Sequence, residues 1–168
     1  TFPVLLMRQP YGRRIASTVV FAHPSWYAAR GFITVIQDVR GRGTSAGDYR
    51  LFVDEGKDGA DAVRWAAALP GANGRVGMYG FSYQGITQLH AAATLLAETG
   101  SAAPLAALAP AMVGYAIDDD WAFEGGSFYL APNIGWGVQM AAEAARLAGD
   151  EAAFLELRRG AGAPPLGD

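Results

Sequence analysis

The chain has 168 residues, of which 51% are hydrophobic, a formal net charge of −3 and no cysteine. This length suits one domain with a core of its own, and the lack of cysteine excludes disulfides and thiolate metal sites. Because basic residues are scattered among acidic ones, and because no apolar run reaches the roughly 18 residues of a membrane span, we expect neither a nucleic-acid nor a membrane partner.

Four short apolar runs predict buried β-strands, and they cover residues 3–8, 32–39, 75–80 and 105–110. Each run is bounded by proline, glycine or charged residues, and each is too short for a helix of ordinary length. Their apolar residues are continuous rather than alternating. This pattern indicates a parallel sheet that is covered on both faces.

Three helical patterns separate these strands, at residues 24–31, 54–71 and 83–100. In the first, Pro24 stands where a first helical residue belongs and Gly31 where a C-terminal cap belongs. The third is apolar on most of its sides and should be a buried helix. The alternation of strand and helix predicts an α/β fold with right-handed crossovers.

The character of the sequence changes after residue 110. A stretch that is aromatic and interrupted by glycine gives way to a helical pattern in which Asp150 is a candidate N-cap. We therefore divide the chain into an α/β core at residues 1–110, a helical cap or lid at residues 111–160 and a loose tail at residues 161–168.

The hexapeptide GFSYQG, residues 80–85, lies where the third strand turns into the third helix. A serine at such a turn is typical of the nucleophile elbow, in which small neighbours allow a strained backbone and a close approach of strand and helix. Ser82 would then stand at a helix N-terminus, where free N–H groups stabilise negative charge. The alternative is a turn serine that only caps the helix. The usual pattern, G-x-S-x-G, has glycine where this chain has Gln84.

Three segments together resemble the family of cocaine esterase-like and X-prolyl dipeptidyl-peptidase-like serine hydrolases (CocE/NonD, peptidase S15). They are LLMRQPYG, VIQDVRGRGTSAGDYRLFVDEGKDGADAVRW and RVGMYGFSYQGITQ, and the resemblance runs from about residue 3 to residue 136. In this family the elbow usually reads G-x-S-Y-x-G, which accounts for the displaced glycine. The resemblance implies a partial α/β-hydrolase fold followed by the start of a helical cap.

The resemblance also implies a role for individual residues. Ser82 would be the nucleophile, while the backbone N–H of Tyr83 and the hydroxyl of Tyr11 would form the oxyanion hole. Trp136 would line the acyl pocket, and Asp120 would pair with the α-ammonium group of an amino acid ester. Without the resemblance, Tyr11 is an ordinary turn tyrosine, Trp136 a core or lid aromatic and Asp120 part of a solvated acidic loop.

A base for Ser82 is missing from the chain as given. The base is normally a histidine that follows the nucleophile and an acid in the chain. His90 lies about 12 Å along the helix from Ser82, and His23 precedes the serine, so we interpret both as structural or surface histidines. In the family the acid and base follow the cap. We therefore expect a fragment of a longer chain, with little activity of its own.

The predicted function is that of a serine hydrolase, acting without a cofactor or metal. It would cleave an acyl ester, an amino acid ester, an amide or an X-Pro peptide through an acyl-enzyme on Ser82. The substrate would be a small molecule or short peptide, and exposed strand edges would favour homo-oligomers. The sequence does not fix the compartment, and we expect a soluble, cytoplasmic protein.

Two alternatives stay open at this stage. One is a non-catalytic or decayed hydrolase fragment. The other is a nucleotide-binding α/β domain, because GRGTSA at residues 41–46 fits the pattern G-x-G-x-x-G/A after a strand. That motif lacks the helix and the acidic residue that it requires. In a hydrolase, the same glycines would form a turn held by Asp38 or Arg40.

Overall fold

The structure is a computed structural model that describes residues 1–14, 20–114 and 116–162. The chain divides into two compact units, Thr1–Val113 and Gly114–Asp168, each of which is described by itself. Apart from residues 161 and 162, the predicted loose tail lies outside the described residues.

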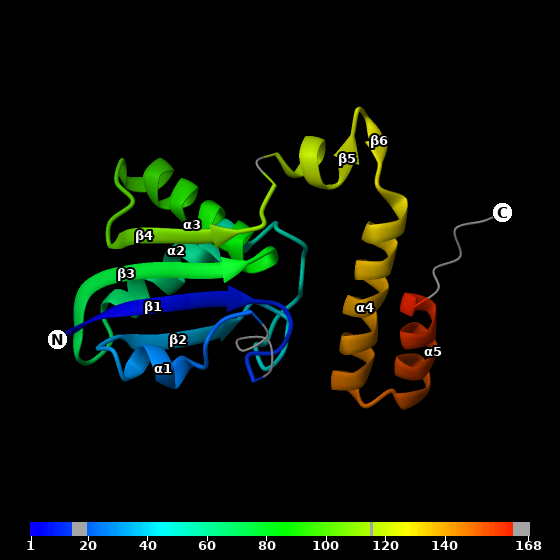
Figure 1. Ribbon diagram of the computed structural model, residues 1–168, viewed down its shortest axis with the longest axis horizontal. Helices are drawn as coiled ribbons and strands as arrows, with labels where there is room; N and C mark the ends of the chain where they lie inside the picture. The colour runs from blue at the N-terminus through cyan, green and yellow to red at the C-terminus, as the bar shows by residue number, and fades with distance from the viewer. Residues whose placement is uncertain (15–19, 115, 163–168) are drawn as a thin grey trace. The chain divides into compact units, whose positions relative to one another are not determined.

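The first unit is built on a four-stranded sheet of parallel strands in the order β2-β1-β3-β4. The strands are β1 (Phe2–Gln9), β2 (Ile33–Asp38), β3 (Ala72–Phe81) and β4 (Leu105–Ala111). All four predicted strands are therefore present, and the predicted parallel sheet is confirmed. Because the strands are parallel, their carboxyl ends meet at one edge of the sheet (Figure 1).

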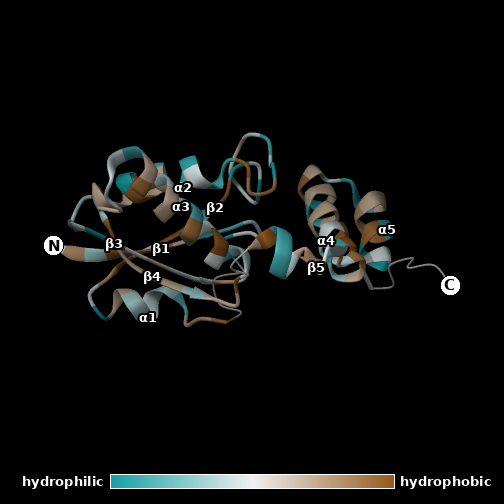
Figure 2. Cartoon of the chain, turned by 90° about the horizontal axis from the view of Figure 1, so that it is seen from above, coloured by the Kyte–Doolittle hydropathy of each residue, from teal (hydrophilic) through white to brown (hydrophobic). Residues whose placement is uncertain are grey.

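Three helices cover this sheet: α1 (Pro24–Ala28), α2 (Glu55–Ala67) and α3 (Tyr83–Thr99). Figure 2 shows α2 and α3 on one face of the sheet and α1 on the other. Pro24 begins α1 as predicted, but the helix is shorter than expected, because Ala29 rather than Gly31 is its C-terminal cap. The predicted α/β layering is confirmed.

The core of this unit lies between the sheet and the α2–α3 layer. Its fully buried side chains come from alternate positions of the two central strands and from the facing sides of the two helices: Val4, Leu6, Val76, Met78, Ala60, Val63, Ala91 and Leu95. Burying one valine, leucine or methionine side chain contributes about 1.5–3 kcal/mol. Small residues let the two helices approach each other closely, since a Cβ atom on Gly59 of α2 would lie 2.8 Å from the Cβ of Ala91 on α3.

The described residues of the second unit form one π-helical turn, a short hairpin and two helices. Its elements are η2 (Ile117–Trp121), β5 (Phe123–Glu124), β6 (Ser127–Phe128), α4 (Leu130–Ala148) and α5 (Glu151–Gly162). The two long helices are joined by Gly149 and Asp150 alone, and they lie side by side (Figure 1).

The second unit confirms one expectation from the sequence and differs from another. Asp150 accepts a hydrogen bond of 3.0 Å from the N–H of Ala153, which confirms the predicted N-cap. The helix before it begins at Leu130, inside the aromatic stretch interrupted by glycine rather than after it. Pro132 falls in the first turn, where its missing N–H costs no helical bond. Within the part of the chain that the structure describes, no helix is long and apolar enough to cross a membrane.

Candidate active site

Ser82 forms the turn between β3 and α3 and has an unusual backbone conformation. Its φ of 58° and ψ of −123° are strained for a residue with a side chain, at a cost of about 1–3 kcal/mol. Two groups hold it there: its N–H donates to the carbonyl of Ala111 (2.8 Å), and its own carbonyl accepts from the N–H of Gly85 (2.8 Å). The side chain is half-buried and makes no capping hydrogen bond to α3. A helix-capping role therefore does not account for this serine.

Glycine is required on both sides of this turn. A Cβ atom on Gly80, where φ is 153°, would overlap the Cβ of Gln84, and one on Gly85 would overlap the side chain of Val113. Gln84 uses its side-chain oxygen to accept a hydrogen bond of 3.0 Å from the N–H of Phe81. The spacing G-x-x-x-x-G thus has a steric reason, and the glutamine between Ser82 and Gly85 helps to close the turn.

Tyr83, the next residue, is anchored by a buried polar network. Its hydroxyl donates to Glu55 Oε1 at 2.7 Å, and Glu55 Oε2 pairs with Arg8 Nη1 at 2.8 Å. Phe52 stacks on the Tyr83 ring with centroids 4.9 Å apart. Burial, together with the charge of Glu55, raises the pKa of Tyr83, so the hydroxyl stays a donor. The backbone N–H of Tyr83 lies in the first turn of α3, at the end of the helix where N–H groups point out of the helix along its axis.

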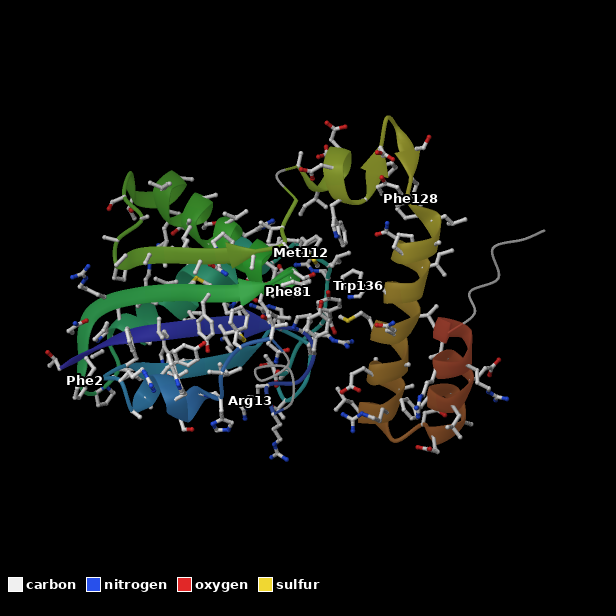
Figure 3. All side chains as sticks on the ribbon, in the orientation of Figure 1. Phe2, Arg13, Phe81, Met112, Phe128 and Trp136 are labelled. Atoms are coloured by element: carbon white, nitrogen blue, oxygen red, sulfur yellow. The ribbon has the colours of Figure 1, made fainter. Side chains whose placement is uncertain are left out.

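Tyr11 follows the end of β1 and lies beside Tyr83. The two rings meet edge to face, with centroids 6.5 Å apart and an angle of 75° between their planes. The N–H of Tyr11 donates to Gln9 Oε1 at 2.7 Å. Since β1 and β3 are neighbours in the sheet, residues at and just after the ends of both strands lie at one edge, as Phe81 and Arg13 illustrate in Figure 3. The structure thus brings Ser82, Tyr83 and Tyr11 to the same edge.

Trp136 and Asp120 both belong to the second unit. Trp136 is half-buried on α4, where its ring meets that of Trp121 edge to face at 5.7 Å (Figure 3). Asp120 is exposed, and its Oδ1 accepts a hydrogen bond of 3.1 Å from the N–H of Ala116. Each residue has a local structural role, and their proposed contacts with a substrate stay predictions.

Both histidines have structural surroundings. His23 caps α1, because its Nδ1 accepts a hydrogen bond of 3.2 Å from the N–H of Ser25. His90 lies on α3 with its ring 6.0 Å from that of Phe52, and burial lowers its pKa. Among the residues that the structure describes, no three metal-ligating side chains form a group that could hold an ion.

The glycine-rich turn at residues 41–46 surrounds a carboxylate rather than an open anion site. Asp38 Oδ2 accepts from the N–H of Thr44 at 2.9 Å, and a Cβ atom on Gly43 would overlap the same carboxylate. A phosphate needs such N–H groups free and would be repelled by this charge. Arg40 instead donates to Asp58 Oδ2 at 2.8 Å, so Asp38 is the residue that holds the turn.

Sequence reasoning missed three residues that support this edge of the sheet, Arg8, Gln9 and Glu55, and it named Asp38 only as one of two candidates to hold the glycine-rich turn. All four residues are at least 95% buried. One signal was available, because Arg8 and Gln9 are polar residues at the end of a strand that was expected to be buried. Such residues need partners, and here they find them near the elbow.

The chain is similar to known proteins in its sequence and in its fold. A sequence model of the X-Pro dipeptidyl-peptidase (S15) family matches residues 1–165. The cocaine esterase of Rhodococcus sp. (strain MB1 Bresler) is 32% identical over 137 residues, which are 80% of this chain and 23% of the esterase. An aminopeptidase from a marine sediment Thaumarchaeota archaeon is 28% identical with a TM-score of 0.64, over 84% of this chain and 26% of that one.

A CocE/NonD family hydrolase from Staphylococcus aureus has the same fold. In two crystal structures it matches with TM-scores of 0.70 and 0.72 at 21% and 20% identity, over 100% and 96% of this chain. The matched parts are 32% and 31% of those chains, so this chain spans about a quarter to a third of the length of these relatives. The likeness confirms the predicted fold class. Since the family match covers nearly every residue, the chain belongs to the X-Pro dipeptidyl-peptidase (S15) family.

Proposed function

We propose that this chain carries the nucleophile and the oxyanion donors of a serine hydrolase that cleaves ester or amide bonds. The observation that carries the proposal is the strained φ of Ser82 at the N-terminus of α3, with a hydroxyl that does not cap the helix. Strain of this kind persists only where the surrounding structure enforces it, and it gathers at functional sites. The relatives named as an esterase and an aminopeptidase act on these two kinds of bond.

The reaction begins when Ser82 Oγ attacks the carbonyl carbon of the substrate and its proton passes to a base. The π electrons of the carbonyl move to its oxygen, and the N–H of Tyr83 and the hydroxyl of Tyr11 donate to that oxyanion. Losing one such donor typically costs about 2.7–4 kcal/mol of transition-state stabilisation. The tetrahedral intermediate then expels an alcohol or amine, which takes the proton from the base, and water releases the acyl group from Ser82.

The base in this proposal is a histidine outside the 168 residues, oriented by an acid. His23 and His90 do not fill this role, since the first caps α1 and the second packs beside Phe52. The substrate is a small ester, an amide or a short peptide. Trp136 would line its acyl pocket and Asp120 would pair with an α-ammonium group, as parts of a helical cap.

A non-catalytic role is the second candidate, and the structural engagement of both histidines favours it for residues 1–168 taken alone. The two candidates differ in one measurable property. An activated serine reacts rapidly with a fluorophosphonate, whereas an ordinary turn serine does not.

The test is fluorophosphonate labelling of the intact protein, meaning the complete product of the gene that encodes this chain. We expect labelling, and we expect Ser82→Ala to abolish it. Ser101→Ala is the matched control, because Ser101 precedes β4 at the opposite edge of the sheet and should leave labelling unchanged. Labelling that survives Ser82→Ala would refute the assignment. An unlabelled intact protein would favour the non-catalytic candidate, and a thermal shift with NAD or ATP would favour a nucleotide site.

A further inference from the structure

We propose that Gln9 and Asp38 are positioning residues, which hold the turn that carries Tyr11 so that its hydroxyl can serve the oxyanion. This inference rests on the proposed function and adds to it two residues that neither the elbow motif nor the turn after β1 contains. Both lie at the carboxyl ends of neighbouring strands, Gln9 on β1 and Asp38 on β2, where they are direct partners in the sheet register.

The Gln9 side chain joins the sheet to the main chain of the turn. It is completely buried. Its Nε2 donates to Asp38 Oδ1 at 2.7 Å, and its Oε1 accepts from the N–H of Tyr11 at 2.7 Å. The first bond fixes which way the amide faces, because only the nitrogen can donate to a carboxylate. The oxygen is therefore held toward Tyr11.

Asp38 binds the same turn at a second point, the main-chain N–H of Arg13. It is 2% exposed, and its Oδ1 also accepts from the N–H of Arg13 at 2.6 Å. On the other side, its Oδ2 accepts from the N–H of Thr44 at 2.9 Å and from the Thr44 hydroxyl at 3.2 Å. Together with Gln9, four protein groups thus donate to this carboxylate, which offsets the cost of burying its charge.

Hydrogen bonds hold the turn on both sides of Gly12, which lies between the amides of Tyr11 and Arg13 and has a φ of +92°. Among the residues that the structure describes, no atom lies within 4 Å of the position that a Cβ would take there. A third bond adds to the restraint, since Arg42 Nε donates to the carbonyl of Pro10 at 3.2 Å. Hydrogen bonds on both sides of Gly12 therefore restrain the backbone of Tyr11, and a shift of 1 Å in such a group can cost about 100-fold in rate.

The experiment is a double-mutant cycle on the rate of fluorophosphonate labelling of the intact protein. Gln9→Leu removes the acceptor for the main-chain N–H of Tyr11. It should slow labelling by about 10- to 100-fold, which is a part of what the loss of an oxyanion donor costs. In a Tyr11→Phe background, where the hydroxyl is already absent, the same change should cost less than about twofold. A residue that acts only on stability would slow both backgrounds equally.

Gln88→Leu is the matched control. Gln88 is also completely buried, and its amide likewise joins elements of the fold, accepting from the N–H of Ala109 at 3.0 Å and donating to the carbonyl of Gln84 at 3.1 Å. Any slowing that this variant causes should be the same with and without the Tyr11 hydroxyl. Hydrogen exchange gives a readout besides labelling, since the Tyr11 amide should exchange faster in Gln9→Leu and not in Gln88→Leu.

Gln9→Glu tests the geometry without removing the side chain. When protonated, the introduced carboxyl can still donate to Asp38 and accept from Tyr11. The negative charge of Asp38 should raise the pKa of the introduced carboxyl above that of an ordinary glutamate. The positive charge of Arg42, whose Nε binds the adjoining Pro10 carbonyl, opposes this shift. The labelling rate relative to wild type should therefore be highest at low pH and fall as the pH rises and two carboxylates face each other.

The outcomes separate this inference from the function on which it rests. Absence of Ser82 labelling in the wild type would overturn the proposed function itself. If Ser82 of the wild type is labelled, but Gln9→Leu slows labelling equally in both backgrounds or in neither, only the positioning role is overturned. The role would also be overturned if the ratio of Gln9→Glu to wild type did not change with pH.

Discussion

The buried ion pair behind Tyr83 allows a quantitative prediction of stability. The side chains of Arg8 and Glu55 are 1% and 6% exposed, and their charged atoms are 2.8 Å apart. Glu55→Leu leaves a buried guanidinium without its carboxylate, and Arg8→Met leaves a buried carboxylate without its guanidinium. Removing one partner of such a pair costs about 3–5 kcal/mol of the free energy of unfolding.

The double variant Arg8→Met/Glu55→Leu should be less destabilised than either single variant. It replaces both charges by apolar side chains, so the remaining costs are the loss of the 2.7 Å bond from the Tyr83 hydroxyl to Glu55 and of the bonds from Arg8 to Gln37 Oε1 (2.7 Å) and to the Glu55 carbonyl (3.1 Å). Leaving one buried donor unpaired costs about 1–3 kcal/mol. The two single changes are therefore expected to be strongly non-additive, with a coupling of several kcal/mol.

Urea unfolding of the intact protein, followed by far-UV circular dichroism, measures these differences. They follow from the shift in the midpoint urea concentration, provided that the free energy of unfolding keeps the same slope against urea concentration. Tyr83→Phe is a useful control, since it removes only the hydroxyl and should cost about 1.5–3 kcal/mol. If the double variant lost the sum of the two single effects, the buried pair would not be acting as a unit. The account of how Tyr83 is anchored would then be wrong.

Three further predictions concern other parts of the first unit. Gly80→Ala should destabilise the protein and slow the labelling of Ser82, because the added methyl overlaps Gln84; thermal unfolding and labelling rates measure this. Burial raises the pKa of Tyr79 to about 12, so stability should fall as the pH rises above 10, where the unfolded chain ionises first, and should fall less steeply in Tyr79→Phe. Burial lowers the pKa of His90, so its NMR titration midpoint should lie below 6.5, and its contribution to stability should be lost as the pH falls through that range.

Each of these predictions has a clear contrary result. Wild-type stability and labelling in Gly80→Ala would mean that strand and helix do not approach as closely as described. An equally steep alkaline loss in Tyr79→Phe would assign that loss to other groups. A His90 midpoint above 6.5 would mean that its neighbour Glu55, whose charge raises the pKa, outweighs burial.

Much of the sheet could be predicted from the sequence because its strands are short apolar runs between breakers. All four runs are strands of one parallel sheet, and the strained turn at Ser82 lies between a strand and a helix, as the position of GFSYQG predicts. The start of α4 could not be predicted in this way. Glycines interrupt the stretch in which this helix begins, and Pro132 falls in its first turn, a position that is compatible with a helix.

The supporting residues of the site were beyond sequence reasoning for a different reason. Arg8 and Glu55 are 47 positions apart, and Gln9 and Asp38 are 29 apart, so their pairing depends on which strands become neighbours. No local pattern specifies that order. Tyr11 could be placed near the elbow only by resemblance to a family, whereas the physical reason, the pairing of β1 with β3, appears once the topology is known.

The most direct test of the central claim is to trap the acyl-enzyme. The intact protein is mixed with an activated ester, quenched in acid within the first turnover, digested and analysed by mass spectrometry. We predict that the mass of the acyl group appears on the peptide that contains Ser82 and disappears on longer incubation as water releases it. An acyl group on any other residue, or turnover with no acylated peptide, would contradict the account.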